Sequence, residues 1–258
     1  MAVYTYGVIT DCGDWKTENQ DSILCVTGNI LLRTAASALF VVADGMGGLS
    51  WGSQVSSYIT ERFRNWWKED FPAMMEAGRS SDEDIRELLE QEIWDINQAI
   101  LDFREHMQCR CGSTLSLLLL YDGKYYIENM GDSRIYGCRH GKMKRLTQDQ
   151  SLVAQYVREK KLTEDEAKKS AQKNILTMCL GMFDVPQSYF LTGKLKEGDV
   201  FLLCSDGLYN PLEPEEMEII LGYGEYTAQE KTEMLRRAVL PGEARDNVSA
   251  VIVHVSSN

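Results

Sequence analysis

The segment Phe40-Val41-Val42-Ala43-Asp44-Gly45 places a carboxylate directly after a run of four apolar residues. A continuous apolar run of this length is typical of a strand that is buried on both faces. A carboxylate at the mouth of such a strand is costly unless it is paired, hydrogen-bonded or bound to a cation. Asp44 is therefore a candidate functional residue, and its partners should be acidic residues that flank other strands.

Aspartates flank predicted strands in four further segments. These are Asn129-Met130-Gly131-Asp132-Ser133-Arg134, Leu202-Leu203-Cys204-Ser205-Asp206-Gly207, Arg245-Asp246-Asn247-Val248 and Glu18-Asn19-Gln20-Asp21-Ser22. Any one of them could be an ordinary turn, because Asp and Gly are common turn residues. Several carboxylates at one end of a sheet would repel each other, and divalent cations would remove that penalty. Hard oxygen ligands select Mg²⁺ or Mn²⁺, and no histidine falls in these segments, which disfavours zinc.

The pattern of apolar residues predicts an antiparallel sheet with layered helices. Strands are expected at 3–10, 23–26, 38–43, 114–120, 124–129, 134–138, 200–203 and 248–255. Asp122-Gly123 and His140-Gly141 each separate two such runs, as tight hairpin turns do. Helices are expected at about 52–67, 85–107, 214–221 and 227–239, with capping boxes at Ser81 and Thr163. Consecutive hairpins argue against alternating strand–helix–strand units and for an α+β fold.

Composition limits the classes of partner. The 258 residues carry 39 acidic and 27 basic side chains, a net charge of -12, which disfavours nucleic acid and anionic membranes. No apolar stretch is long enough for a membrane span and no signal peptide is visible. Seven scattered cysteines predict reduced thiols in a cytoplasmic protein, and Cys109-Arg110-Cys111 lacks the second pair that a zinc site needs. No linker interrupts the chain, so residues 1–258 are expected to form a single catalytic domain.

Seven motifs in order resemble the bacterial form of the metal-dependent type-2C Ser/Thr protein phosphatase family. They span nearly the whole chain: Asn19-Gln20-Asp21, Val42-Ala43-Asp44-Gly45-Met46-Gly47-Gly48, Gly112-Ser113-Thr114, Gly131-Asp132-Ser133-Arg134, Leu146-Thr147-Gln148-Asp149, Ser205-Asp206-Gly207-Leu208 and Arg245-Asp246-Asn247. The resemblance implies a four-layer α-β-β-α sandwich with two central antiparallel sheets, and a flap insert at about 151–173.

The resemblance also implies the metal ligands. Asp44 would bridge two Mn²⁺ or Mg²⁺ ions, and the carbonyl of Gly45 with the carboxylates of Asp206 and Asp246 would complete the protein ligands. Asp21 would act through metal-bound water. Asp132, together with Asp206, would hold a third, weaker ion.

The chain departs from the family pattern at two positions. Lys16 stands where most members have an Arg that grips the substrate phosphate, and a Lys cannot make the same planar two-pronged contact. Met46 stands where the animal enzymes have a His proposed as general acid. Bacterial relatives also have Met at this position. Lys16 is expected to bind the phosphate, and the general acid stays unassigned.

The expected activity is hydrolysis of phosphoserine and phosphothreonine in proteins by a water activated between two metal ions. The expected partners are phosphorylated proteins and an opposing Ser/Thr kinase, and the expected state is a monomer. Three alternatives stay open: an inactive member that acts as a binding or regulatory module, a metal-dependent hydrolase of a small phosphate ester or a nucleotide, and a purely structural sandwich. Metal-dependent turnover on phosphopeptides would separate them.

Overall fold

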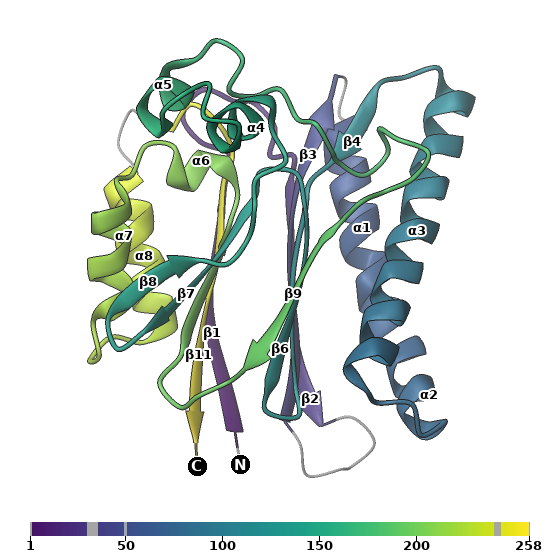
Figure 1. Cartoon of the computed structure of the whole chain (residues 1–258), viewed down its shortest axis with the longest axis vertical. Coiled ribbons are helices and arrows are strands. Elements are labelled where there is room, and N and C mark those ends of the chain that lie inside the picture. Colours follow the sequence, from purple (N-terminus) through teal and green to yellow (C-terminus); the bar gives the residue numbers. More distant parts are fainter. Residues whose placement is uncertain (1, 30–35, 49–50, 240–243, 258) are drawn as a thin grey trace.

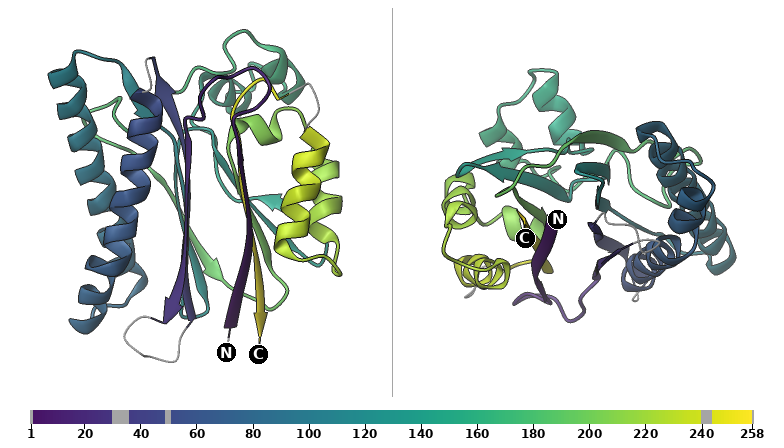
Figure 2. Two further views of the ribbon diagram at one scale, coloured as in Figure 1. Left: turned by 180° about the vertical axis from the view of Figure 1, so that it is seen from behind. Right: turned by 90° about the horizontal axis from the view of Figure 1, so that it is seen from below.

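The computed structural model describes residues 2–29, 36–48, 51–239 and 244–257. Its strands form two antiparallel sheets that lie face to face, and helices cover the outer face of each sheet (Figures 1 and 2). This arrangement confirms the expected α+β fold, a four-layer α-β-β-α sandwich. Every described helix is too short or too polar to cross a lipid bilayer.

The elements form three groups: the strands of the first sheet, the strands of the second sheet, and the helices. The first sheet contains β1 (Ala2–Asp11), β7 (Arg134–Arg139), β8 (Lys142–Arg145), β10 (Val200–Cys204) and β11 (Val248–Ser257). The second sheet contains β2 (Asp21–Asn29), β3 (Ala36–Gly47), β4 (Cys111–Ser113), β5 (Leu115–Tyr121), β6 (Lys124–Met130) and β9 (Tyr189–Lys194). The helices are α1 (Trp51–Lys68), α2 (Asp70–Glu76), α3 (Asp82–Met107), α4 (Leu152–Arg158), α5 (Glu164–Lys169), α6 (Asp206–Tyr209), α7 (Pro214–Gly222) and α8 (Ala228–Val239).

Strand order joins segments that are distant in sequence. The first sheet runs β1-β11-β10-β7-β8, and the second runs β2-β3-β5-β6-β9 with β4 paired to the end of β3. The hairpin turns lie where the sequence predicts them. Asp122 and Gly123 have φ values of 48° and 72°, and His140 and Gly141 have 52° and 72°. Positive φ at both central residues matches the right-handed twist of the strands that these turns connect.

Helix α3 begins where the sequence predicts it. The Ser81 hydroxyl accepts a hydrogen bond from the Asp84 amide, and the Asp84 carboxylate accepts one from the Ser81 amide in return. Thr163 and Glu166 make the same reciprocal pair at the start of α5. Met107, the last residue of α3, is 42% exposed.

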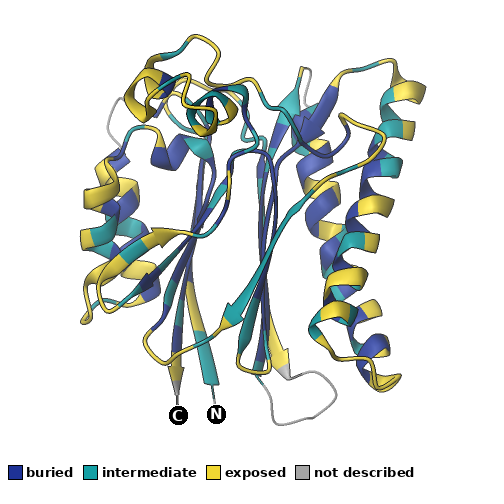
Figure 3. Ribbon diagram, in the orientation of Figure 1, coloured by how far each residue is buried: buried dark blue, intermediate teal, exposed yellow. Residues whose placement is uncertain are grey.

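Alternate side chains of β3 enter two different cores. Val41 and Ala43 pack in the core under α1 and α3, whereas Phe40 and Val42 pack between the two sheets. A third core lies between the first sheet and helices α7 and α8. Figure 3 shows the buried strands between largely exposed outer helix faces. Burial on both faces explains the unbroken apolar run before Asp44.

Candidate active site

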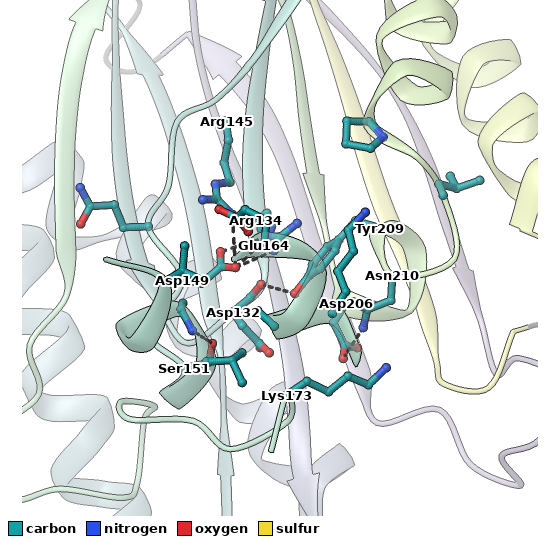
Figure 4. A pocket seen from close by; sticks show the side chains of 18 of the residues that line it. Asp132, Arg134, Arg145, Asp149, Ser151, Glu164, Lys173, Asp206, Tyr209 and Asn210 are labelled. Atoms are coloured by element: carbon teal, nitrogen blue, oxygen red, sulfur yellow. Dashed lines mark hydrogen bonds and ion pairs between the residues drawn. The ribbon is translucent and has the colours of Figure 1, made fainter. Parts of the chain in front are cut away.

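The predicted aspartates meet at one end of the sandwich, and both sheets contribute to the group. Asp21 is the first residue of β2 and pairs across the sheet with Asp44 of β3. Asp206 follows β10 as the first residue of α6, and Asp246 lies just before β11. Asp132 lies in the turn between β6 and β7, beside Asp206 (Figure 4).

The carboxylates are buried close enough to raise one another's pKa. Burial and then the charge of Asp21 raise the pKa of Asp44 well above its ordinary value. Burial raises the pKa of Asp21 to about 6 and that of Asp206 to about 6, with the charge of Asp246 adding to both shifts. Burial and the charge of Asp206 raise the pKa of Asp132 to about 8. Without cations the cluster therefore opposes folding at neutral pH.

Metal-free protein is expected to lose stability as the pH rises. These groups have folded-state pKa values near 6 to 8 and an unfolded value of 3.8, so the unfolded state releases protons first. The penalty is absent below about pH 4 and grows until about pH 8. Thermal unfolding in EDTA, followed from pH 5 to pH 8, measures it.

Asp132→Asn isolates the contribution of the site. This variant should lose less stability over the same pH range, because it lacks one carboxyl group whose pKa is raised in the folded state. Glu128 lies outside the cluster, and burial raises its pKa to about 8, so Glu128→Gln is the matched control for pH effects from elsewhere. A pH dependence identical in Asp132→Asn and the parent protein would contradict the assignment.

The Gly112-Ser113-Thr114 motif fixes the backbone of Asp44. The Thr114 hydroxyl accepts a hydrogen bond of 3.0 Å from the Asp44 amide, and the Thr114 amide donates one of 2.9 Å to the Asp44 carbonyl. The Ser113 hydroxyl also donates to that carbonyl, at 3.0 Å. Thr114 in turn shares a 2.7 Å hydrogen bond with the hydroxyl of Ser133. Two motifs distant in sequence therefore hold the bridging candidate in place.

Asn247 joins the loop that carries Lys16 to the end of the first sheet. Its carboxamide oxygen accepts a 2.9 Å hydrogen bond from the Gln20 amide, and its Nδ2 donates to the carbonyls of Cys12 and Glu18, each at 2.9 Å. The Asn247 amide also donates to Asp246 Oδ1 at 2.9 Å. The sequence motif had named Asn247 without a role, and the structure makes it a positioning residue for Asp246.

Lys16 lies at the site, where it pairs with a candidate ligand. Its Nζ is 2.8 Å from Asp246 Oδ1, and about half of each side chain is exposed. The hydrogen bond to Asp246 raises the pKa of Lys16, although partial burial opposes the shift. The flap supplies a second cation that the sequence had not indicated: Figure 4 shows Lys173 near Asp206.

The donor set fits a hard divalent cation. Asp21 Oδ2 accepts a 2.8 Å hydrogen bond from Ser205, but Oδ1 is buried and has no partner among the described residues. Within those residues no three acidic, histidine or cysteine side chains converge as a complete metal site. Carboxylates and a backbone carbonyl such as that of Gly45 are oxygen donors of the kind that Mg²⁺ accepts, together with water.

A pocket of about 660 Å³ opens beside Asp132 and Asp206, between the flap and the helices α6 and α7. Backbone contacts join the start of the flap to the residues that follow it. The amide of Leu152 donates to the carbonyl of Ile175, and Ser151 forms an isolated β-bridge with Leu176. Gln150 anchors the flap to the site: its amide donates to the carbonyl of Gly131. The pocket thus gives access to one edge of the carboxylate cluster (Figure 4).

Asp149 lines this pocket and pairs with two arginines. Its carboxylate accepts hydrogen bonds from Arg134 Nη2 at 2.6 Å and from Arg145 Nη1 at 3.3 Å. The Arg134 guanidinium also lies 3.6 Å from the centre of the Tyr209 ring. The Tyr209 hydroxyl donates a 2.9 Å hydrogen bond to the carbonyl of Asp132. These contacts connect Asp149, through Arg134 and Tyr209, to Asp132, the aspartate expected to hold a third ion.

Oxygen ligands for divalent cations, gathered where two sheets meet beside an open pocket, form the arrangement of a metal-assisted hydrolase. The family model described as protein phosphatase 2C matches residues 14–239. The chain belongs to this family and is a protein serine/threonine phosphatase.

Known relatives match over almost the whole chain. The protein phosphatase PhpP of Streptococcus pneumoniae is 31% identical over 251 residues, which cover 96% of both proteins. The serine/threonine phosphatase of S. agalactiae superposes with a TM-score of 0.87 at 28% identity, over 98% of this chain and 99% of that one. The catalytic domain of the phosphatase PstP, solved with two manganese ions, gives a TM-score of 0.83 at 25% identity over 100% of each chain.

Proposed function

We propose that this enzyme hydrolyses phosphoserine and phosphothreonine in proteins with two Mn²⁺ or Mg²⁺ ions. Asp44, the Gly45 carbonyl, Asp206 and Asp246 would hold the two ions, and Asp132 with Asp206 would hold a third. The observation that carries the proposal is the group of mutually repelling carboxylates whose pKa values are raised. The manganese ions in the related PstP structure support the choice of metal.

The chain's own groups position and charge the site. When bound, the ions supply a water of lowered pKa and neutralise charge on the phosphoryl oxygens. The Ser205 hydroxyl donates to Asp21 Oδ2, which leaves Asp21 Oδ1 able to accept a hydrogen bond from a water. Lys16 offers an ammonium group to a phosphate oxygen, next to Asp246. The work of the protein is therefore mainly orientation and electrostatics.

The oligomeric state, the cellular compartment and the opposing kinase belong to the same proposal. We infer that residues 1–258 act as one monomeric catalytic domain in the cytoplasm, where the enzyme opposes a Ser/Thr kinase. The seven free thiols support a reducing compartment. The partners in this proposal are phosphorylated proteins and the opposing kinase.

A comparison of substrates under identical metal conditions tests the proposal. The protein should hydrolyse p-nitrophenyl phosphate and a phosphothreonine peptide with Mn²⁺ or Mg²⁺, and EDTA should abolish both reactions. Phosphothreonine peptides should be preferred over phosphotyrosine peptides and small phosphate metabolites. Full activity in EDTA would refute the metal model, and preference for a small metabolite would refute the protein substrate.

Lys16→Ala should raise KM for a phosphopeptide by about tenfold or more, because it removes a charged hydrogen bond to the phosphate. Lys16→Arg is the matched control, since it keeps the charge and should keep KM within a few-fold of the parent value. Both variants are assayed at saturating Mn²⁺. If Lys16 serves only to balance Asp246, the alanine variant will show altered Mn²⁺ affinity by calorimetry with an unchanged KM.

A further inference from the structure

Two thiols, those of Cys109 and Cys111, lie where α3 ends and β4 begins, and Figure 1 shows this junction of the two elements. The Sγ atoms of Cys109 and Cys111 are 3.7 Å apart, and both residues are free thiols. A third thiol, that of Cys179, lies beside the next residue of β4, because a Cβ atom added at Gly112 would lie 3.3 Å from its Sγ. Cys109 is partly exposed, whereas Cys111 and Cys179 are buried, so Cys109 is the thiol that a reagent can reach.

Arg104, near the end of α3, provides positive charge for this group. Burial raises the pKa of Cys111 to about 11 and that of Cys179 to about 12, and the charge of Arg104 opposes both shifts. The Arg104 Nε atom is buried and has no hydrogen-bond partner in the described part of the chain. The guanidinium only partly offsets the effect of burial on Cys111 and Cys179, so the partly exposed Cys109 is the thiol placed to attack first.

Strand β4 connects the thiols to the active site. Cys111 pairs with Gly47, and Ser113, two residues later, pairs with Gly45. A Cβ atom added at Gly47 would lie only 3.0 Å from the Cβ of Cys111, so the two strands are in close contact. Because Ser113 also binds the Asp44 carbonyl, a displacement of β4 would be passed to the candidate metal ligands.

We propose that Cys109 and Cys111 form a reversible oxidation site, at which a small-molecule disulfide converts the two thiols into a disulfide and slows the phosphatase. The two sulfur atoms already lie at contact distance, in one short segment. The site is separate from the residues that bind metal and phosphate. Its effect on the enzyme passes through the pairing of β4 with β3.

The reaction balances as two thiol–disulfide exchanges. Cys109 attacks one sulfur of the small disulfide, its S–H bond is lost, and one small thiol leaves. Cys111 then attacks the Cys109 sulfur of the mixed disulfide, and the second small thiol leaves with the proton that Cys111 gives up. The two cysteines are oxidised, and the small disulfide is reduced to two thiols.

Bond formation requires movement of the backbone or the side chains. The two Sγ atoms must approach from 3.7 Å to about 2.05 Å. The Cys109 amide is held to the carbonyl of Arg104 at 3.2 Å, so the end of α3 resists movement on one side. The remaining displacement falls on Cys111 and the strand pair that it forms with Gly47. Excess thiol reduces such a disulfide by the reverse exchange, which makes the change reversible.

Treatment of the full-length protein with oxidised glutathione tests the proposal. The protein is oxidised in EDTA, the glutathione is removed, and the sample is divided between peptide mass spectrometry and a Mn²⁺-dependent assay. The peptide containing Cys109 and Cys111 should lose two hydrogen atoms. Turnover of p-nitrophenyl phosphate should fall about tenfold or more, since a 1 Å displacement of catalytic groups can cost about 100-fold. A phosphine reductant should restore both.

Two variants give matched controls. Cys109→Ser removes the accessible thiol and should keep its activity through the treatment, whereas Cys25→Ala, at a partly buried thiol of β2, should be inactivated like the parent. The mass measurement does not depend on turnover, so it separates this proposal from the proposed function. The proposal is overturned if the two thiols stay reduced, if the disulfide forms without loss of activity, or if Cys109→Ser is inactivated as the parent is.

Discussion

Asp44→Asn should lower kcat/KM by at least about 1000-fold, on the scale of losing a principal electrostatic group of an active site. The asparagine keeps the shape of the side chain but removes the charge that is expected to bridge two cations. Mn²⁺ titration by calorimetry should show weaker binding in the same variant. Turnover of p-nitrophenyl phosphate at several Mn²⁺ concentrations provides the second measurement.

The loss should occur without unfolding. Because burial and neighbouring carboxylates raise the pKa of Asp44, the metal-free variant should be at least as stable as the parent at neutral pH. Asp122→Asn is the matched control, because Asp122 lies in a hairpin turn with a positive φ that asparagine tolerates. Activity of Asp44→Asn within tenfold of the parent would exclude the bridging role.

Asp149→Ala should lower the free energy of unfolding by about 3–5 kcal/mol, because it leaves a mostly buried guanidinium without its partner. The side chains of Asp149 and Arg134 are 8% and 21% exposed. Urea denaturation with equal slopes for parent and variant measures the change. The Tyr209 contact with Asp132 depends on the same packing, so Mn²⁺-dependent activity should also fall.

Arg145→Ala separates this effect from general loss of charge. Arg145 makes the longer of the two ion pairs with Asp149, and its side chain is 38% exposed. Its removal should cost at most about 1 kcal/mol, as is usual for ion pairs near the surface. If Asp149→Ala and Arg145→Ala lower the free energy of unfolding equally, the Arg134–Asp149 pair is not the main stabilising contact of Asp149.

The location of the acidic residues could be predicted because each one flanks a strand. Asp44 and Asp206 end apolar runs that are buried on both faces, and such runs are visible in a sequence. The pairing of Asp21 with Asp44 was not predictable, because strand order depends on contacts between distant segments. The same limit applies to Arg134 and Asp149, whose motifs were recognised separately and which meet across the β7–β8 hairpin.

The missed elements are those with weak local patterns. Strand β9 lies at a sheet edge, and its residues are only half-buried, so no apolar run or regular alternation marks it. Helix α2 has a proline in its first turn and only seven residues. The single turn of α6 is too short for a helical period, although the Asn210 to Asp206 hydrogen bond at 3.1 Å follows the i, i+4 spacing of a helix.

The division of the site between two sheets has a consequence for the lifetime of the protein. Asp21 and Asp44 belong to one sheet, and Asp206 and Asp246 flank strands of the other, so a ligand held by both pairs cross-links them. Such a ligand binds the native state alone and stabilises it by about 2.7 kcal/mol at 100 times its dissociation constant. Proteolysis and amide hydrogen exchange should therefore slow as the supply of divalent cations rises, and the abundance of the enzyme would follow the metal supply of the cell.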